Sequence, residues 1–250
     1  MGDVMTTLFI RRVFAAGVIG LSSVVLTACG GGLSGLMSQA PQEAETPAAP
    51  AVVTVKIEEL MVAGPLGDKA LGKATAPVTV IEYASLTCPV CSAYHKNTFP
   101  AFKKAYIDTG KVRYIWREFP IGRASAAAAI AVRCSPEKSY YKLNEKFLAN
   151  QPAWVAQEIK TEEIYNIVKE TGLKRAAFDA CYANQKINDD LVAVKQRGRA
   201  LGVNGTPTFF INGQRLRGGL SLEEMAKVID PQLNPAAPAP QQAQAQAGRV

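Results

Sequence analysis

The sequence predicts a mixed α/β fold in which an all-helical segment interrupts a sheet-forming core. Three observations predict it: a run of β-branched residues at 78–83, a series of helical patterns without a convincing strand from 123 to 201, and a return of strand character at 207–217. The expected order of elements is β, β, α, β, a helical block, β, β, α.

The first half of the chain is expected to hold three strands and one helix. A short strand pattern lies within residues 52–60, and better ones occupy 78–83 and 112–119, the last of which ends at Pro120. Pro89 suits the first turn of a helix, and apolar residues continue from it at helical spacing, namely Val90, Tyr94 and Phe99.

The helical block carries start and stop signals. Residues 126–134 are rich in alanine, and Thr161 is expected to cap a helix that stops at Gly172. Gly202 is expected to end a further helix, whose apolar face holds Ile187, Leu191 and Val194.

The C-terminal part is expected to form a hairpin and a last helix. A strand at 207–212 meets the turn signal Asn212-Gly213, which leads into a strand at 215–217. A capping box begins at Ser221, and the helix that it opens is expected to stop at Pro231.

Composition limits the class of protein. The chain has 250 residues, of which 48% are hydrophobic, so it can build the core of one domain. The formal net charge of +7 comes from scattered Lys and Arg without a basic block, so nucleic-acid binding is not expected.

The N-terminus indicates export. Arg11 and Arg12 precede an uncharged apolar run at 13–26, which suits a signal peptide and is short for a membrane span. Leu26-Thr27-Ala28-Cys29-Gly30 resembles a bacterial lipobox. The resemblance implies a lipoprotein signal peptide at 1–28 and lipid on Cys29. The alternatives are an uncleaved anchor or an ordinary signal peptide with a chance cysteine.

Two flanking segments are expected outside the folded part. Residues 29–51 contain many Gly, Ser, Ala and Pro and are interpreted as a flexible linker from the lipid. Residues 231–250 are Pro-, Ala- and Gln-rich and are interpreted as a disordered tail. The folded part is therefore expected at about 52–230.

The strongest chemical signal is the sequence Cys88-Pro89-Val90-Cys91, placed where a strand meets a helix. A thiolate on Cys88 would face unpaired backbone N–H groups and the positive end of the helix, so its pKa should fall. Cys91, one turn later, can attack a mixed disulfide on Cys88. The alternatives are a zinc half-site, a haem attachment site and a purely structural disulfide. Zinc lacks further paired ligands, and Ser92 replaces the histidine that haem attachment needs.

Two longer sequences resemble the DsbA family of thiol–disulfide oxidoreductases. Residues 80–91 are similar to the active-site strand and helix start of that family, and residues 202–213 are similar to its cis-proline loop. The resemblance implies a thioredoxin fold, formed by 52–122 and 202–230, with a helical insertion domain at 123–201. Together with the export signal it predicts an extracytoplasmic enzyme, for which we expect no cofactor and no metal.

Three site residues are carried over from the resemblance. Pro207 is expected to be the cis-proline facing the disulfide, and the backbone of Thr206 is expected to pair with an extended substrate. Glu82 is expected to pass a proton behind the cysteine pair. The alternatives are a trans proline and a carboxylate in water. His95 could influence Cys91, although a packed or surface histidine is favoured.

Cys134 and Cys181 are expected to form a second, structural disulfide. If Cys29 carries lipid, four of the five cysteines remain, and these two are left as a pair by elimination. Some DsbA-like proteins of α-proteobacteria carry a second disulfide in the helical domain, which supports the pairing. Two buried thiols or a second redox relay remain open.

The chain departs from the family at two positions. Val90 stands where the best-known members have histidine, so we expect a less depressed pKa at Cys88 and a less oxidising disulfide. Thr206 stands where the strong oxidants have valine, and in this it resembles periplasmic isomerases and some divergent DsbA-like proteins. The direction of electron flow therefore stays open.

The leading hypothesis is a periplasmic, lipid-anchored monomer that introduces disulfides into reduced exported proteins. Cys88 and Cys91 would exchange with substrate, and a DsbB-like membrane partner would reoxidise them. One alternative is a disulfide reductase or isomerase. Another, of a different class, is a lipoprotein that holds copper on Cys88, Cys91 and His95 without catalysis.

Overall fold

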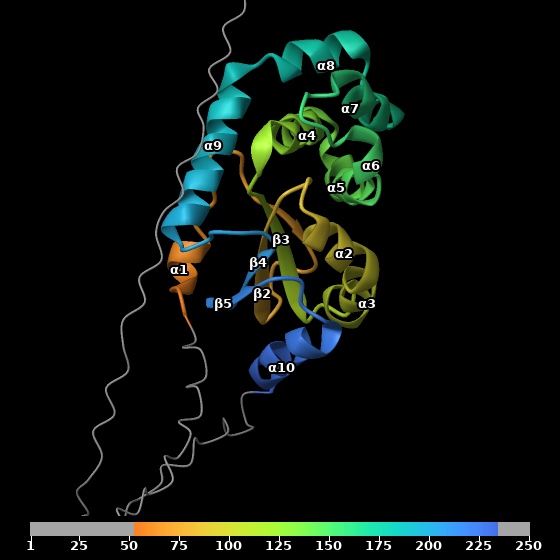
Figure 1. Cartoon of the computed structure of the whole chain (residues 1–250). Coiled ribbons are helices and arrows are strands. Elements are labelled where there is room, and N and C mark those ends of the chain that lie inside the picture. Colours follow the sequence, from red (N-terminus) through yellow and green to blue (C-terminus); the bar gives the residue numbers. More distant parts are fainter. Residues whose placement is uncertain (1–52, 235–250) are drawn as a thin grey trace, which may run out of the picture. The chain divides into compact units, whose positions relative to one another are not determined.

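A five-stranded mixed sheet forms the centre of the computed structural model, which describes residues 53–234 (Figure 1). Its strand order is β1-β3-β2-β4-β5, with β2 and β3 parallel and the other neighbours antiparallel. The strands are β1 (Lys69–Leu71), β2 (Val78–Ala84), β3 (Val112–Glu118), β4 (Thr208–Ile211) and β5 (Gln214–Arg217). β2 is therefore a central strand, paired on both sides.

Ten α-helices accompany the sheet in the described residues. They are α1 (Ile57–Leu60), α2 (Pro89–Asn97), α3 (Phe99–Phe102), α4 (Gly122–Cys134), α5 (Tyr140–Ala149), α6 (Gln151–Trp154), α7 (Thr161–Val168), α8 (Arg175–Tyr182), α9 (Gln185–Ala200) and α10 (Leu222–Leu233). Short π or 3-10 turns lie at Lys103–Ile107, Glu137–Ser139 and Lys169–Thr171.

The alternation of side chains along the strands divides the core between the two faces of the sheet. On one face, Ile81 and Tyr83 of β2 pack in a cluster with Leu60 of α1. On the other, Val80 and Ala84 pack in the larger cluster that includes residues of α2, α3 and α10. Glu82 has the same parity as Val80 and Ala84, so this carboxylate lies on the α2 face.

The fold class predicted from the sequence is confirmed. Between β3 and β4 the chain forms only helices, α4 to α9, and Figure 1 shows α4 to α8 gathered beyond one end of the sheet. The described helices include none that is long and apolar enough to cross a bilayer. The domain boundaries at 122/123 and 201/202 stay predictions.

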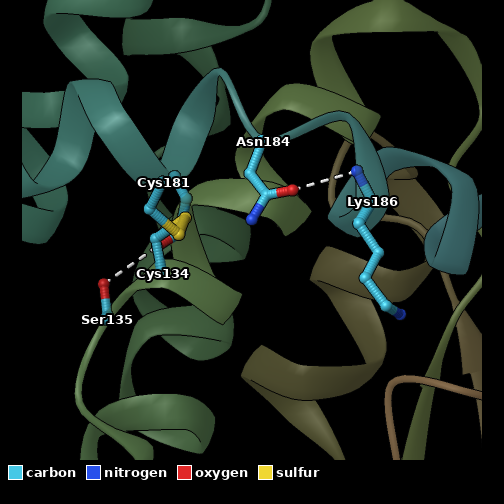
Figure 2. The surroundings of a disulfide bond; sticks show 6 residues. Cys134, Ser135, Cys181, Asn184 and Lys186 are labelled. Carbon is cyan, nitrogen blue, oxygen red and sulfur yellow. Dashed lines mark hydrogen bonds between the residues drawn. A yellow bond between two sulfur atoms is a disulfide. The ribbon is translucent and has the colours of Figure 1, made fainter.

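A disulfide joins two helices of this block (Figure 2). Cys134 ends α4 and Cys181 lies in α8, and their sulfur atoms are 2.00 Å apart. Nearby, the Ser135 hydroxyl donates to the Ala131 carbonyl at 2.9 Å, and the Asn184 side chain accepts from the Lys186 N–H at 3.0 Å, which caps α9. The predicted pairing of these cysteines is thus present in the structure.

Two expectations for the N-terminal and helical parts were wrong, and one strand was missed. The strand expected at 52–60 is reduced to one bridge between Thr54 and Gln214, because Leu60 packs as part of helix α1. β1 was missed, because its three residues carry no β-branched side chain. Thr161 is the first residue of α7, whose N-cap is Lys160 without a side-chain hydrogen bond.

The last helix does not stop at Pro231. The capping box of Ser221 and Glu224 is present, but α10 continues through the proline to Leu233. A proline costs a helix one backbone hydrogen bond. Here Leu233 packs on the core, and the Gln232 side chain donates to the Val228 carbonyl at 2.8 Å. The predicted tail therefore begins after a helical end.

Three predictions lie outside the described residues. They are the signal peptide at 1–28, the lipid on Cys29 and the linker at 29–51. The part of the tail beyond 234 lies outside them as well.

Candidate active site

Cys88 and Cys91 lie at the N-terminal end of α2, directly after the loop that leaves β2. Cys88 is the N-cap residue, Pro89 opens the helix, and both cysteines are free thiols. The Cys91 N–H donates to the Cys88 sulfur at 3.3 Å. This sulfur therefore caps the helix end at which a negative charge is stabilised by backbone N–H groups.

The pKa of Cys88 is lowered from 9.0 to about 5. The largest cause is the hydrogen bond from the Cys91 thiol, and burial of the side chain opposes the shift. The Thr206 side chain and the backbone N–H groups of Cys91 and Val90 lower the pKa further. Cys88 is therefore a thiolate at neutral pH although Val90 supplies no imidazole.

Cys91 has the opposite character. It is fully buried, and burial raises the pKa of its thiol far above the ordinary value. The hydrogen bond to Cys88 and the charge of Glu82 raise this pKa further. One thiol of the pair is thus ionised at neutral pH, and its neighbour keeps its proton until a base removes it.

The peptide bond between Thr206 and Pro207 is cis, as the family resemblance implied. When it carries its proton, the Cys88 thiol donates to the Thr206 carbonyl at 3.2 Å. The Thr206 hydroxyl oxygen is buried and has no hydrogen-bond partner among the described residues, so it is free to donate to the Cys88 thiolate. Thr206 therefore faces Cys88 from the loop that precedes β4.

Glu82 lies under α2 in the central strand and is fully buried. Its Oε2 accepts from the Tyr114 hydroxyl of β3 and lies 3.0 Å from His95 Nε2 of α2. Its Oε1 has no partner in the described chain. The alternative of a carboxylate in water is therefore wrong. His95 is packed, as favoured, but it also contacts this carboxylate.

The helical block holds the active-site loop by hydrogen bonds. The Gln151 side chain of α6 donates to the carbonyls of Leu86 and Cys88, at 2.8 and 3.0 Å. The hydroxyl groups of Ser85 and Ser125 are 2.8 Å apart, and Ser125 also accepts from the Leu86 N–H at 3.1 Å. The position of Cys88 therefore depends on α4 and α6 as well as on α2.

Sequence reasoning missed Tyr114, Ser125 and Gln151. Tyr114 could have been found from the period of two, because it alternates with Ile115 along the strand as Glu82 does with Ile81. No local signal marks Gln151, which lies 63 residues beyond Cys88. Among residues 53–234 no cluster of three or more His, Cys, Asp or Glu is arranged to hold a metal.

The chain matches a family model described as Thioredoxin over residues 66–231. A relative from Rickettsia conorii, which bears the name of a protein-disulfide oxidoreductase, is 34% identical over 194 residues. This match covers 76% of the present chain and 67% of the relative. A Rickettsia typhi relative of the same name is 33% identical, and 64% of it is covered, so the chain spans about two thirds of such relatives.

Solved structures give the same picture. The crystal structure of Wolbachia pipientis alpha-DsbA1 aligns with a TM-score of 0.65 at 32% identity and covers 71% of this chain and 96% of that one. The oxidised BdbD of Bacillus subtilis aligns with a TM-score of 0.62, covering 73% and 97%, and its 22% identity shows the fold alone.

Proposed function

The chain belongs to the DsbA family of thioredoxin-like disulfide oxidoreductases, and on that premise we propose that its Cys88–Cys91 pair introduces disulfides into reduced exported proteins. The observation that carries the proposal is the contrast within the pair. Cys88 has a pKa of about 5 at a helix start, and Cys91 is a fully buried thiol of raised pKa.

The reaction begins with the pair as a disulfide. A substrate thiolate attacks the Cys88 sulfur, and the electron pair of the broken bond leaves on Cys91, which gains a proton. A second thiolate of the substrate then attacks the substrate sulfur that is bound to Cys88 in the mixed disulfide. Cys88 leaves as a thiolate, which its low pKa makes a good leaving group. Two electrons pass from substrate to the pair.

Glu82 is the proposed proton donor and acceptor for Cys91. Its Oε1 is buried without a partner, and its charge already raises the pKa of Cys91. A buried thiolate on Cys91 has no access to water, so a neighbouring carboxyl group is the simplest source of its proton.

Thr206 and its surroundings are the proposed binding place for an extended substrate segment. The Thr206 carbonyl reaches Cys88, and two apolar side chains beside the active-site loop, Val90 and Ile121, are 45% and 49% exposed. Thr87 of that loop donates to the Ile121 carbonyl at 2.9 Å. Exposed apolar groups next to Cys88 suit unfolded reduced chains, whose apolar residues are accessible.

An oxidising compartment outside the cytoplasm is the proposed location, with lipid on Cys29 as anchor. The disulfide between Cys134 and Cys181 supports it, because disulfides persist in such compartments. A membrane partner of the DsbB type would reoxidise the pair, and the protein would act as a monomer.

The test follows the pair in living cells with the full chain. We expect the wild-type pair to rest as a disulfide, Cys88→Ser to abolish oxidation of a reduced model protein, and Cys91→Ser to accumulate mixed disulfides with exported proteins. A pair that rests as a dithiol would instead show a reductase or isomerase. Absence of trapped mixed disulfides would contradict thiol exchange altogether.

A further inference from the structure

The oxidoreductase chemistry leaves the surroundings of His95 unexplained. Cys91 and His95 lie four residues apart on α2 and therefore on the same side of the helix. The His95 side chain is 4% exposed and lies among the rings of Phe99, Trp116 and Tyr94. A histidine whose ring is packed in this way still holds its hydrogen bond to Glu82.

The two ring nitrogens of His95 have different partners. Nε2 is bonded to Glu82 Oε2, whereas Nδ1 is buried and has no hydrogen-bond partner within residues 53–234. An imidazole that keeps one nitrogen for a carboxylate can change its charge only through the other nitrogen. Nδ1 is thus the atom at which this ring gains or loses a proton.

His95 also lines a pocket between α2, α3 and α5, which we name the α2–α5 pocket. Its volume is about 350 Å³, and it is lined by Ser92, His95, Lys96, Phe99, Pro100, Lys103, Glu145, Leu148 and Ala149. Neither Cys88 nor Thr206 lines it, so it differs from the surface on which substrate is proposed to bind. His95 is therefore the residue that both borders this pocket and contacts Glu82.

We propose that His95 takes up one proton from solvent in the α2–α5 pocket when the Cys88–Cys91 pair is reduced, and releases it when the disulfide forms. This inference rests on the proposed function, because it assumes that the pair cycles between disulfide and dithiol. It assigns His95 as a positioning residue, which acts on Cys91 through Glu82.

The protons and electrons balance as follows. When the disulfide closes, the Cys91 thiol gives its proton to Glu82 Oε1 and its electron pair to the new bond with Cys88. The sulfur that was bound to Cys88 leaves with the electron pair of the broken bond. Glu82 is then neutral, so the buried imidazolium of His95 has lost its counter-ion and releases its Nδ1 proton. Reduction reverses each step.

Among the charged and titratable groups around His95, Glu82 is the one to which its ring is hydrogen-bonded. Tyr114 is bonded to the same carboxylate, and Tyr94 and Cys91 are buried neighbours on α2 whose pKa values are raised by burial and by Glu82. At the pocket lie two cations and one anion from three segments, namely Lys96, Lys103 and Glu145. Lys103 is paired with Asp108 at 2.6 Å.

The decisive experiment uses His95 as a spectroscopic probe, because it is the single histidine of the 250-residue chain. The full chain, purified with a histidine-free tag and labelled with ¹⁵N-histidine, is studied by NMR in its oxidised and reduced forms. We expect an imidazolium in the reduced form that persists to a pH about one unit or more above that of the oxidised form. The same histidine charge in both forms between about pH 5 and 9 would overturn the inference.

Two variants test whether Glu82, rather than the carboxylate at the pocket, links the charge of His95 to the redox state of the cysteine pair. In Glu82→Gln the redox dependence of the His95 signal should vanish, whereas Glu145→Gln, at the pocket, should keep it. A dependence that survives Glu82→Gln would refute the role of the carboxylate. The wild-type comparison decides the main point even if Glu82→Gln fails to fold.

The reduction potential supplies an independent readout. His95→Gln keeps a hydrogen-bond donor for Glu82 but cannot titrate. If His95 takes up one proton on reduction, the equilibrium constant for reduction changes tenfold per pH unit on account of that proton, which is about 30 mV per pH unit for a two-electron couple. The His95→Gln variant should lack this part of the pH dependence. An unchanged pH slope would contradict proton uptake by His95. A pair that forms no disulfide would refute the proposed function itself and this inference with it, whereas a normal disulfide with an unchanged histidine refutes only the inference.

Discussion

Cys88 and Cys91 lie three residues apart at the start of one helix, whereas Cys134 and Cys181 lie 47 residues apart on two helices. The first pair is present as free thiols and the second as a disulfide. The first pair has a carboxylate beneath it and the Thr206 loop facing it. The surroundings of the two cysteine pairs therefore differ, and so does their chemistry: the first pair suits thiol exchange and the second a permanent crosslink.

Loop length explains part of the difference. A crosslink stabilises a fold by restricting the unfolded chain, which amounts to about 4 kcal/mol for a loop of 47 residues and about 2 kcal/mol for four residues. The thiolate of Cys88, by contrast, stabilises the reduced form of its own pair. The short pair is therefore suited to open, and the long pair to stay closed.

The largest expected effect on activity comes from removing a cysteine of the first pair, compared with removing the second pair. Cys88→Ser should lower thiol oxidation of a reduced model protein by more than about a thousandfold, because without Cys88 the site cannot form the disulfide that the substrate thiolate attacks. The double variant Cys134→Ser, Cys181→Ser is the matched control and should retain most of the activity. Loss of activity in the control would contradict the division between the pairs.

The same control variant should lose stability. Removal of the Cys134–Cys181 bond should lower the free energy of unfolding by up to about 4 kcal/mol, because the unfolded chain regains its freedom. Denaturant unfolding of the two proteins, both with Cys88 and Cys91 oxidised, measures the difference. A variant as stable as the wild type would show that the bond is not structural.

The charge of Cys88 predicts a dependence of reactivity and stability on pH. Alkylation of the reduced pair by iodoacetamide should rise with a midpoint near pH 5, since the pKa of Cys88 is about 5. Because this pKa is lowered on folding, the unfolded chain binds more protons between pH 5 and the ordinary value of 9.0. The stability that the thiolate contributes is therefore lost as pH falls towards 5.

Unfolding measurements check the sign of this effect. The reduced protein, compared with Cys88→Ser, should gain stability from about pH 5 to 8, and the oxidised protein should show no such gain. Above that range the raised pKa of Cys91 acts in the opposite direction. A flat difference between about pH 5 and 8 would contradict an ionised Cys88.

A smaller effect is expected from the Thr206 hydroxyl, which helps to lower the pKa of Cys88. Thr206→Val should raise the alkylation midpoint by roughly one pH unit, since a hydrogen bond to a charged group contributes about 1.5–3 kcal/mol. Thr208→Val is the control, because the Thr208 hydroxyl donates to the Gly205 carbonyl at 2.7 Å. Equal alkylation midpoints in the wild type and both variants would show that the Thr206 hydroxyl does not lower the pKa of Cys88.

The sequence was sufficient for the features that local pattern determines. The strand before Cys88, the helix at Pro89, the turn at Asn212 and the capping box of Ser221 are present where they were expected. The cysteine pairing and the Thr206–Pro207 bond also agree with the resemblance. Each of these depends on residues close together in the chain or on an established family pattern.

The remainder depends on contacts between distant segments, which no local pattern reports. Gln151 reaches the Cys88 carbonyl from α6, and His95 and Tyr114 meet at one oxygen of Glu82 from a helix and a strand. β1 forms by pairing with β3 although its own residues favour no strand. Leu233 holds the helix end beyond Pro231 for the same kind of reason.

The reduction potential of the Cys88–Cys91 pair tests the central claim most directly. The full chain is equilibrated with glutathione buffers, and the fraction of disulfide is measured. A pKa of about 5 for Cys88 lies between about 7 for thioredoxin and about 3.5 for DsbA. We therefore predict a potential between about −200 and −120 mV, and a value at or below about −270 mV would contradict an oxidising pair.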